Sequence, residues 1–445
     1  MAPGSRPPLR EDQRTPLDSP PLTRRNWWLH VLEGTTLIGA GAAINPNTVG
    51  SALVESLGGA AWMVALMPMA THVGFSLGPI LSAHHLDRRS EFIPVLRAML
   101  PLSRLPLLLT AAVLWFSGAG PLALWAVVGG ALAYGVAGGL SIGAWQQLIA
   151  KTVPPSERPS LFASRYLFSN VLGLGAGALV AVVLTRCPGT QGYALLYCVA
   201  FAGATLAYHL ITRVSEPASP PPPPTPPRSL LQNLGDVPTL FGGDRRLSLY
   251  LLTAVLVNSQ FIFIGFLAIH AQRTLNAPEG YIGALTTAQM AGAVAGTFLA
   301  ARWGRRVGSR SLLLGSRALF LVVAVGGLLA QSDYAFRALF ALYGAALWSN
   351  LVGHNTVTLE LLPNQRRATM LATFGLVQVP SMLIASQLGA LLWRGGGFTW
   401  VAVVSSLGLL AANATAWRLP RALAIAEPLP LASPRPAITE PAPAE

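Results

Sequence analysis

About twelve runs of mostly apolar residues, each long enough to cross a lipid bilayer as a helix, occupy most of this chain. A hydrocarbon core of about 30 Å requires about 20 apolar residues per helix, because every backbone N–H and C=O must find its partner within the segment. The runs lie near residues 28–57, 60–83, 93–116, 121–149, 160–185, 193–211, 248–272, 281–303, 311–330, 336–362, 368–393 and 399–417. The sequence therefore predicts an all-α integral membrane protein with about 12 transmembrane helices.

The charged residues point to a lipid partner. They make up only 11% of the chain, whereas soluble domains carry roughly 25%. The net charge of +13 comes from short basic clusters between the apolar runs, which favours anionic lipid head groups over nucleic acid. Cys187 and Cys198 lie near a predicted loop and inside an apolar run, so they indicate neither a disulfide nor a metal site. We expect no cofactor and no nucleic-acid partner.

A proline-rich stretch, EPASPPPPPTPPRSLLQNLGDVPTLFGGDRRLS, separates six apolar runs from the next six. Such a stretch is a semi-rigid spacer without a core. We therefore expect six-helix bundles at 27–212 and 248–418, a cytoplasmic linker at 213–247, and polar ends at 1–26 and 419–445. The first end lacks the apolar core of a signal peptide, so we expect the first span to be retained.

Arginine is divided unevenly between the predicted loops. The loops after even-numbered spans and the two ends carry Arg24, Arg25, Arg88, Arg89, Lys151, Arg158, Arg213, Arg228, Arg245, Arg246, Arg302, Arg305, Arg306, Arg310, Arg366, Arg367, Arg418 and Arg421. The opposite loops carry at most one each, at Arg186, Arg273, Arg337 and Arg394. Because cytoplasmic loops hold the excess of positive charge, we expect a multi-pass protein of the cell membrane with both termini in the cytoplasm.

The two sets of six runs are related by sequence. Sliding the chain by 218 positions places Gly78 on Gly296, Leu81 on Leu299 and Arg88 on Arg306. The stretch VPPSERPSLFAS at 153–164 lies over LPNQRRATMLAT at 362–373 in the same order along each half. These matches indicate an internal duplication. Two parallel six-helix halves joined by a long loop are typical of transporters with a rocking mechanism.

The segment GTFLAARWGRRVGSR, residues 296–310, resembles the loop signature of the major facilitator superfamily, Gly-x-Leu-Ala-Asp-Arg-x-Gly-Arg-Arg. The segment keeps Arg302, Gly304, Arg305 and Arg306 of that signature, whereas Ala301 stands at its acidic position. The copy in the first half keeps only Asp87, Arg88 and Arg89. Together with the topology, this identifies the chain as a member of the superfamily from about Arg25 to Leu419.

The resemblance implies alternating access, with cytoplasmic arginines clamping the two halves in one state of the cycle. The candidates are the signature residues above and the matching pair Arg158 and Arg367. The alternative is that these arginines only set the topology of the chain. The resemblance also places the substrate site near the bilayer midplane between the halves.

Polar and aromatic side chains occur at that depth in several spans. They are Asn45, His72, Tyr134, Asn170, Asn258, Gln260, Gln289, Trp348, Asn350, His354 and Gln378. Polar groups in hydrocarbon are costly unless they are paired, so we expect this set to face a substrate cavity. The alternative is helix-to-helix hydrogen bonding without a ligand, at about 0.6 kcal/mol per bond.

Charges inside the spans are rarer. Arg104 lies at mid-depth, where insertion of an arginine costs about 2.5–3.5 kcal/mol. Glu33 lies in the first span and Glu360 near the cytoplasmic end of the tenth. We expect Glu33 to pair with Arg97 or Arg104 and to be the acid that couples transport to protons. The alternative is a static ion pair that joins the first and third spans.

Small residues interrupt two spans. In GAGAAINPN, Gly39, Gly41 and Pro46 predict a bend or a close helix crossing in the first span. In LGLGAG, residues 172–177, the spacing of the glycines predicts tight helix contact.

We expect a secondary active transporter, a monomer, that moves a small solute by alternating access, with proton coupling and export as the favoured direction. An uptake carrier for a sugar or another neutral polar solute, or a transport-dead sensor, is the alternative. The chain has no Gly-x-x-x-x-Gly-Lys loop for ATP, and it has no motif of a membrane-embedded enzyme.

Overall fold

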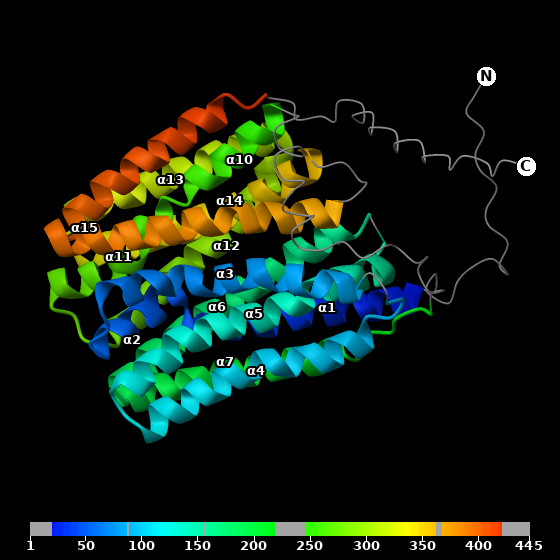
Figure 1. Ribbon diagram of the computed structural model, residues 1–445, viewed down its shortest axis with the longest axis horizontal. Helices are drawn as coiled ribbons and strands as arrows, with labels where there is room; N and C mark the ends of the chain where they lie inside the picture. The colour runs from blue at the N-terminus through cyan, green and yellow to red at the C-terminus, as the bar shows by residue number, and fades with distance from the viewer. Residues whose placement is uncertain (1–19, 87–88, 155, 219–244, 362–366, 421–445) are drawn as a thin grey trace, which may run out of the picture.

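The computed structural model describes residues 20–86, 89–154, 156–218, 245–361 and 367–420, and its described residues form helices and no strands. In the first bundle the elements are α1 (Pro20–Gly41), η3 (Ala42–Ile44), η4 (Pro46–Gly50), α2 (Ser51–Ser56), α3 (Ala61–Leu86), α4 (Ile93–Phe116), α5 (Pro121–Thr152), α6 (Arg158–Arg186) and α7 (Thr190–Ile211). In the second bundle they are α10 (Arg245–Val257), α11 (Gln260–Leu275), α12 (Tyr281–Val307), α13 (Ser309–Leu329), α14 (Asp333–Leu361) and α15 (Arg367–Trp417). Figure 1 shows the two bundles lying side by side with their helices running in the same general direction.

Ten helices of the described chain are long and apolar enough to cross a membrane. The last of these, Phe374–Trp417, is 44 residues long and contains the eleventh and twelfth expected spans. The helix is broken at Gly396 and Gly397, where Gly397 has a φ of 63°, and Figure 1 shows its orange and red parts side by side. The predicted all-α membrane fold with two bundles is thereby confirmed.

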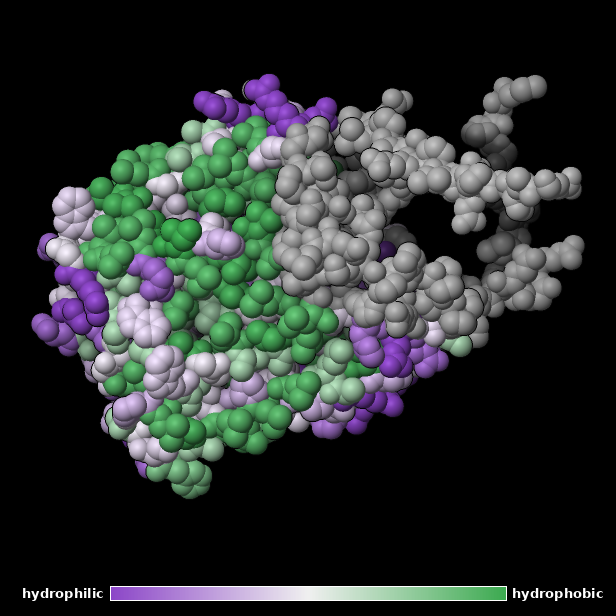
Figure 2. All heavy atoms as spheres, viewed as in Figure 1, coloured by the Kyte–Doolittle hydropathy of each residue, from purple (hydrophilic) through white to green (hydrophobic). Residues whose placement is uncertain are grey.

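The helix α1 is not among those ten, although it occupies the first expected span. Its sequence includes the polar residues Asn26, His30 and Glu33, and the structure buries all three inside the bundle. The side chains that face outward elsewhere are large and apolar, as on α4, where Leu105 and Leu109 are exposed. Figure 2 shows hydrophobic residues over much of the face turned to the viewer, with most of the hydrophilic residues at its margins. Such a surface suits hydrocarbon rather than water.

The glycines that match between the halves have the same role in each. A Cβ at Gly74 would lie 2.5 Å from the nitrogen of Val136, and one at Gly78 would overlap the backbone of Gly139, so α3 and α5 cross in close contact. In the second half, Cβ atoms at Gly292 and Gly296 would similarly overlap the backbone of α14. Each pair of glycines is separated by the same shift of 218 positions found in the sequence. The duplication therefore extends to how each half is packed.

The first span of each half is interrupted near its middle, at an asparagine. In the first half the helix ends at Gly41 and resumes at Ser51, and Asn45 at the break has φ −48° and ψ 119°. In the second half Asn258 lies between α10 and α11. The bend predicted from GAGAAINPN is thus present, and Asn45 Oδ1 accepts a hydrogen bond of 2.9 Å from the backbone N–H of Asn47 across it.

The two ends of the bundles are distinct. The start of α1 and the end of α7 meet at one end, where Asn26 and Ser215 exchange two hydrogen bonds of 3.0 Å. We call this end the terminal face. The other end carries α2 and the turn between α11 and α12, and we call it the α2 face.

Candidate functional site

The seam between the halves has two sides: on one, α12 packs against α6 and η4, and on the other, α3 packs against α11 and α15. The first side carries the buried polar contacts. Three polar pairs bridge it, and all six side chains are buried. The pairs are Asn45 Nδ2 to Gln289 Oε1 at 3.2 Å, Thr48 Oγ1 to Thr286 Oγ1 at 2.7 Å, and Asn170 Nδ2 to Thr297 Oγ1 at 3.4 Å. Because these bonds join residues from different halves, they must break if the halves separate.

Small residues let α6 and α12 approach along this seam. A Cβ at Gly177 would lie 2.5 Å from Thr287 Oγ1, and one at Gly173 would lie 2.9 Å from the sulfur of Met290. A Cβ at Gly283 would overlap the backbone of Ala181. The tight contact predicted from LGLGAG is therefore present, and it joins the two halves rather than two helices of one half.

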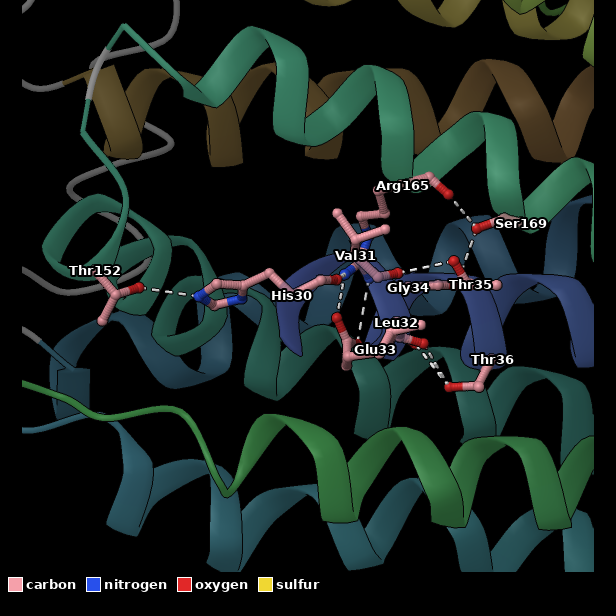
Figure 3. Close-up of polar contacts among 10 residues, drawn as sticks. All are labelled: His30, Val31, Leu32, Glu33, Gly34, Thr35, Thr36, Thr152, Arg165 and Ser169. Atoms are coloured by element: carbon pink, nitrogen blue, oxygen red, sulfur yellow. Dashed lines mark hydrogen bonds and ion pairs between the residues drawn. The ribbon is translucent and has the colours of Figure 1, made fainter. Parts of the chain in front are cut away.

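Glu33 forms an ion pair with Arg165 on α6, which corrects the prediction of Arg97 or Arg104 as its partner. The pair is buried, and Figure 3 shows it between α1 and α6. Arg165 Nη2 donates to Glu33 Oε1 at 3.3 Å, and Nη1 donates to the other carboxylate oxygen and to the carbonyl of His30 at 2.9 Å. The guanidinium carbon also lies 4.7 Å from the centroid of the Trp145 ring.

The two arginines predicted as partners bind elsewhere because α4 packs against α7 and not against α1. Arg104 is buried and donates from Nη2 to the carbonyl of Ala204 at 2.7 Å and from Nη1 to the carbonyl of Leu100 at 2.7 Å. Arg97 is exposed, and its Nη2 donates to the carbonyl of Thr212 at 3.4 Å. The expected ion pair therefore joins the first and fifth spans, not the first and third.

Substituting Gly34 with alanine should weaken the Glu33–Arg165 pair. A Cβ at Gly34 would overlap the Arg165 side chain, and the same turn is fixed by Ser169 Oγ, which donates to the carbonyl of Gly34 at 3.0 Å. We expect a loss of about 1–3 kcal/mol in unfolding free energy, as is typical of overpacked sites. Chemical denaturation of the purified protein measures it. Gly41→Ala, where a Cβ meets nothing within 4 Å, is the control for helix propensity and should leave the pair intact.

Several predicted cavity residues have partners inside the second half. Asn258 Nδ2 donates to Ser381 Oγ at 2.8 Å, and Gln260 Oε1 accepts from the Tyr343 hydroxyl at 3.3 Å. Gln378 Nε2 donates to a backbone carbonyl of its own helix at 3.4 Å. These contacts fit the alternative of helix-to-helix hydrogen bonding, and they do not place the three side chains at the seam.

Three more of the predicted cavity residues are aromatic or histidine side chains. Two of them contact the opposite half, and the third packs within the first half. The ring of His72 is exposed, with its centroid 6.0 Å from that of Phe261 across the seam. Trp348 lies 5.1 Å from Tyr166 on α6, also across the seam. Tyr134 packs on Phe75 within the first half, at 6.2 Å.

The remaining two, Asn350 and His354, gather around a residue that the sequence analysis did not select. Asn350 Oδ1 accepts from Ser316 Oγ at 3.4 Å, and His354 Nδ1 lies 2.6 Å from the Tyr250 hydroxyl. Arg317, next to Ser316 in the chain, is buried and lies within electrostatic range of His354. The sequence signal for it is the match of LRAML (96–100) with SRALF (316–320), which sets Arg97 against Arg317 at an offset of 220 positions. Arg97, however, is exposed.

Among the arginines expected to clamp the two halves, those with a described partner contact residues of their own half. Arg89 Nη2 lies 3.3 Å from His85 Nε2. Arg158 donates to the carbonyls of Ala150 and Val153 at 2.8 and 3.1 Å, so it caps the end of α5. Arg302 and Arg306 are exposed on α12.

The side chains of the remaining predicted clamp residues, and of one predicted acid, lie outside the described part of the structure. Asp87 and Arg88 lie outside the described residues, and for Gly304, Arg305, Glu360 and Arg367 only the helical backbone is described.

The α2 face is bridged by further contacts between the halves. Arg273 on α11 forms an ion pair with Glu55 on α2, with Nε 3.0 Å from Glu55 Oε1. The backbone N–H of Gly189 donates to Glu279 Oε2 at 3.0 Å, and Gln387 Nε2 donates to the carbonyl of Trp62 at 3.4 Å. The described inter-half polar contacts thus gather from the middle of the seam to the α2 face.

The described part of the chain contains no group of three or more His, Cys, Asp or Glu side chains that could hold a metal ion.

The chain is similar to known membrane transporters in fold, and part of its sequence matches a family model. The family model of the Major Facilitator Superfamily matches residues 249–443, and no curated protein matches the chain by sequence. Among solved structures the chain resembles a D-xylose-proton symporter, with 17% identity, a TM-score of 0.66, and coverage of 90% of this chain and 98% of that one.

It also resembles a bacterial homologue of the iron transporter ferroportin in an inward-facing state, with 16% identity, a TM-score of 0.62, and coverage of 89% and 98%. A POT family transporter in complex with 5-aminolevulinic acid is similar at 12% identity and a TM-score of 0.63, with coverage of 88% and 94%. At these identities the likeness shows a shared fold.

Proposed function

Because this chain belongs to the Major Facilitator Superfamily, we propose that it is a secondary transporter that moves a small solute by alternating access of its two halves. The observation that carries the proposal is the buried polar seam, in which Asn45, Thr48 and Asn170 of the first half meet Gln289, Thr286 and Thr297 of the second. Hydrogen bonds between halves can exchange for bonds to a solute, and a site at the interface of two repeats is what rocking transporters use.

In this proposal the described conformation is inward-facing: the halves are closed together at the α2 face. The contacts that bridge the halves gather toward the α2 face, through Glu55–Arg273 and Gly189–Glu279. The excess of arginine in the loops of the terminal face favours a cytoplasmic location for that face. The α2 face would then be the closed outer side, and a solute would enter or leave the seam from the cytoplasm.

Proton coupling is assigned to Glu33. It is the acidic residue with the least exposure in the described chain, at 5%, and its carboxylate is held by Arg165. Protonation of Glu33 would release Arg165, which then binds the carbonyl of His30 alone. The α1–α6 contact would change with it, and α6 forms the seam. The amide and aromatic groups along the spans suit an amphipathic solute, which favours export.

Proton movement driven by a solute is the direct test. The purified protein is reconstituted into liposomes that contain a pH-sensitive dye, and amphipathic and neutral polar solutes are added one at a time. We expect at least one solute to evoke proton flux through the wild-type protein. In Glu33→Gln we expect solute exchange to persist while solute-driven proton flux is lost, because the glutamine cannot carry a proton.

Glu157→Gln is the matched control, since Glu157 is an exposed acid at the start of α6 and should leave proton flux unchanged. Proton flux that persists in Glu33→Gln would exclude Glu33 as the coupling acid. A wild-type protein that moves none of the solutes would favour a sensor over a transporter.

A further inference from the structure

Arg317 on α13 is a buried cation for which the described residues supply no counter-charge. Its side chain is 1% exposed, and its Nε and Nη1 atoms have no hydrogen-bond partner. In the part of the chain that the structure describes, no carboxylate pairs with it and no aromatic ring lies under it. An isolated charge at membrane depth costs several kcal/mol, and such residues mark ligand or ion pathways.

The other buried charges of the described chain are compensated. They are Glu33, Arg104 and Arg165. Glu33 neutralises Arg165, and Arg104 donates to two carbonyls and to Ser103 Oγ at 2.6 Å. Of these four buried charged residues, only Arg317 has buried donor atoms without a hydrogen-bond partner among the described residues. For its Nε and Nη1 the described interior supplies neither an anion nor an acceptor.

A polar cluster from α10 and α14 lies within electrostatic range of Arg317, through Tyr250 and His354. The Tyr250 hydroxyl lies 2.6 Å from His354 Nδ1 and 3.0 Å from Thr358 Oγ1. Ser316, its neighbour on α13, reaches Asn350 Oδ1 at 3.4 Å. Tyr250 and Thr358 are buried, whereas His354 is partly exposed, so His354 marks the side from which a ligand would approach.

We propose that Arg317 anchors an anionic group, a carboxylate or a phosphate, of the transported solute. The inference rests on the proposed transport function and narrows its substrate class to organic anions. A guanidinium binds such groups with charge-assisted hydrogen bonds and keeps its charge at any working pH. The hydroxyl of Tyr250 and the ring of His354 are placed to complete the site. The amide and aromatic groups of the seam would accept the rest of an amphipathic anion.

The test is anion-dependent stability of the full chain in nanodiscs of zwitterionic lipid. The probes are acetate, succinate, benzoate, inorganic phosphate and glycerol phosphate, each compared with chloride at equal ionic strength. We expect at least one carboxylate or phosphate to raise the melting temperature of the wild-type protein in a saturable way. Glucose, as a neutral polar control, should have no such effect.

Variants assign the effect to Arg317. Arg317→Met should weaken the apparent anion affinity by about tenfold or more, since charge-assisted hydrogen bonds are lost. Without anions its melting temperature should equal or exceed that of the wild type, because a buried cation without a partner has been removed. Arg317→Lys keeps the charge and should retain a weakened response. Arg97→Met, at the duplicated position in the first half, should respond like the wild type.

The inference is overturned if no anion stabilises the wild-type protein more than chloride does. It is also overturned if Arg317→Met responds normally, or if this variant unfolds while Arg317→Lys shows no loss of affinity. Nanodiscs containing anionic lipid form a parallel arm. Stabilisation by that lipid alone, lost in Arg317→Met, would assign the site to a head group instead. Binding needs no transport, so a protein that binds anions but moves no solute would contradict only the transport proposal.

Discussion

Replacing Arg165 with methionine should lower the free energy of unfolding by about 3–5 kcal/mol, the usual loss when one partner of a buried ion pair is removed. Glu33 would remain buried with its carboxylate uncompensated. The carbonyl of His30 would lose its side-chain donor, and the ring of Trp145 would lose the cation above it. Denaturant unfolding of the purified protein, followed by intrinsic fluorescence, measures the change.

The matched comparison is Arg337→Met, which breaks the exposed pair with Asp333 on α14. Exposed pairs contribute about 0–1 kcal/mol, so the free energy of unfolding of this variant should be close to that of the wild type. The double variant Glu33→Gln, Arg165→Met should recover most of the loss, because no charge is left without its partner. Equal losses in Arg165→Met and Arg337→Met would mean that water reaches the Glu33–Arg165 pair in the resting protein.

The architecture was predictable from the sequence because bilayer thickness sets the length of each apolar run. The duplication followed from the shift of 218 positions, whereas most of the linker expected at 213–247 lies outside the described residues. The same shift anticipated the helix crossings at Gly78 and Gly296, since a glycine kept at equivalent positions implies equivalent packing. Asn45 at the break of the first span lies at the seam as expected, through its bond to Gln289.

The partner of Glu33 could not be predicted, because sequence spacing does not tell which helices are neighbours. Arg97, Arg104 and Arg165 all lie in apolar runs, and only the packing of α1 against α6 selects Arg165. The burial of Arg317 could not be predicted for a related reason. Its counterpart Arg97 lies at the equivalent position but is exposed, so the duplication predicts the position of an arginine and not its burial.

The polar residues at mid-depth also do not all face one cavity. Asn258 and Gln260 find partners within their own half, whereas Asn170 reaches across the seam. Depth along a helix follows from residue number, but the face on which a side chain lies depends on how each helix is rotated in the bundle.

Replacing Gly283 with leucine should open the α2 face while leaving the fold intact. A side chain at Gly283 would overlap the backbone of Ala181, and this contact joins the two halves that separate during transport in the proposed mechanism. Overpacking typically costs 1–3 kcal/mol, and a penalty confined to one state of about that size shifts the population by about 5–150-fold. The protein can relieve the overlap by moving the halves apart.

The readout is a single cysteine at Thr286, which is fully buried at the seam, in a background where Cys187 and Cys198 are serine. We expect maleimide labelling of Thr286→Cys to be slow in the parent and about tenfold or more faster with Gly283→Leu. The control is Gly292→Leu, because Gly292 meets the carbonyl of Ala341 within one half. That overlap cannot be relieved by separating the halves, so Gly292→Leu should lower the melting temperature. If Gly283→Leu melts like Gly292→Leu and labels slowly, the α6–α12 contact is a fixed part of the core and the halves do not part there.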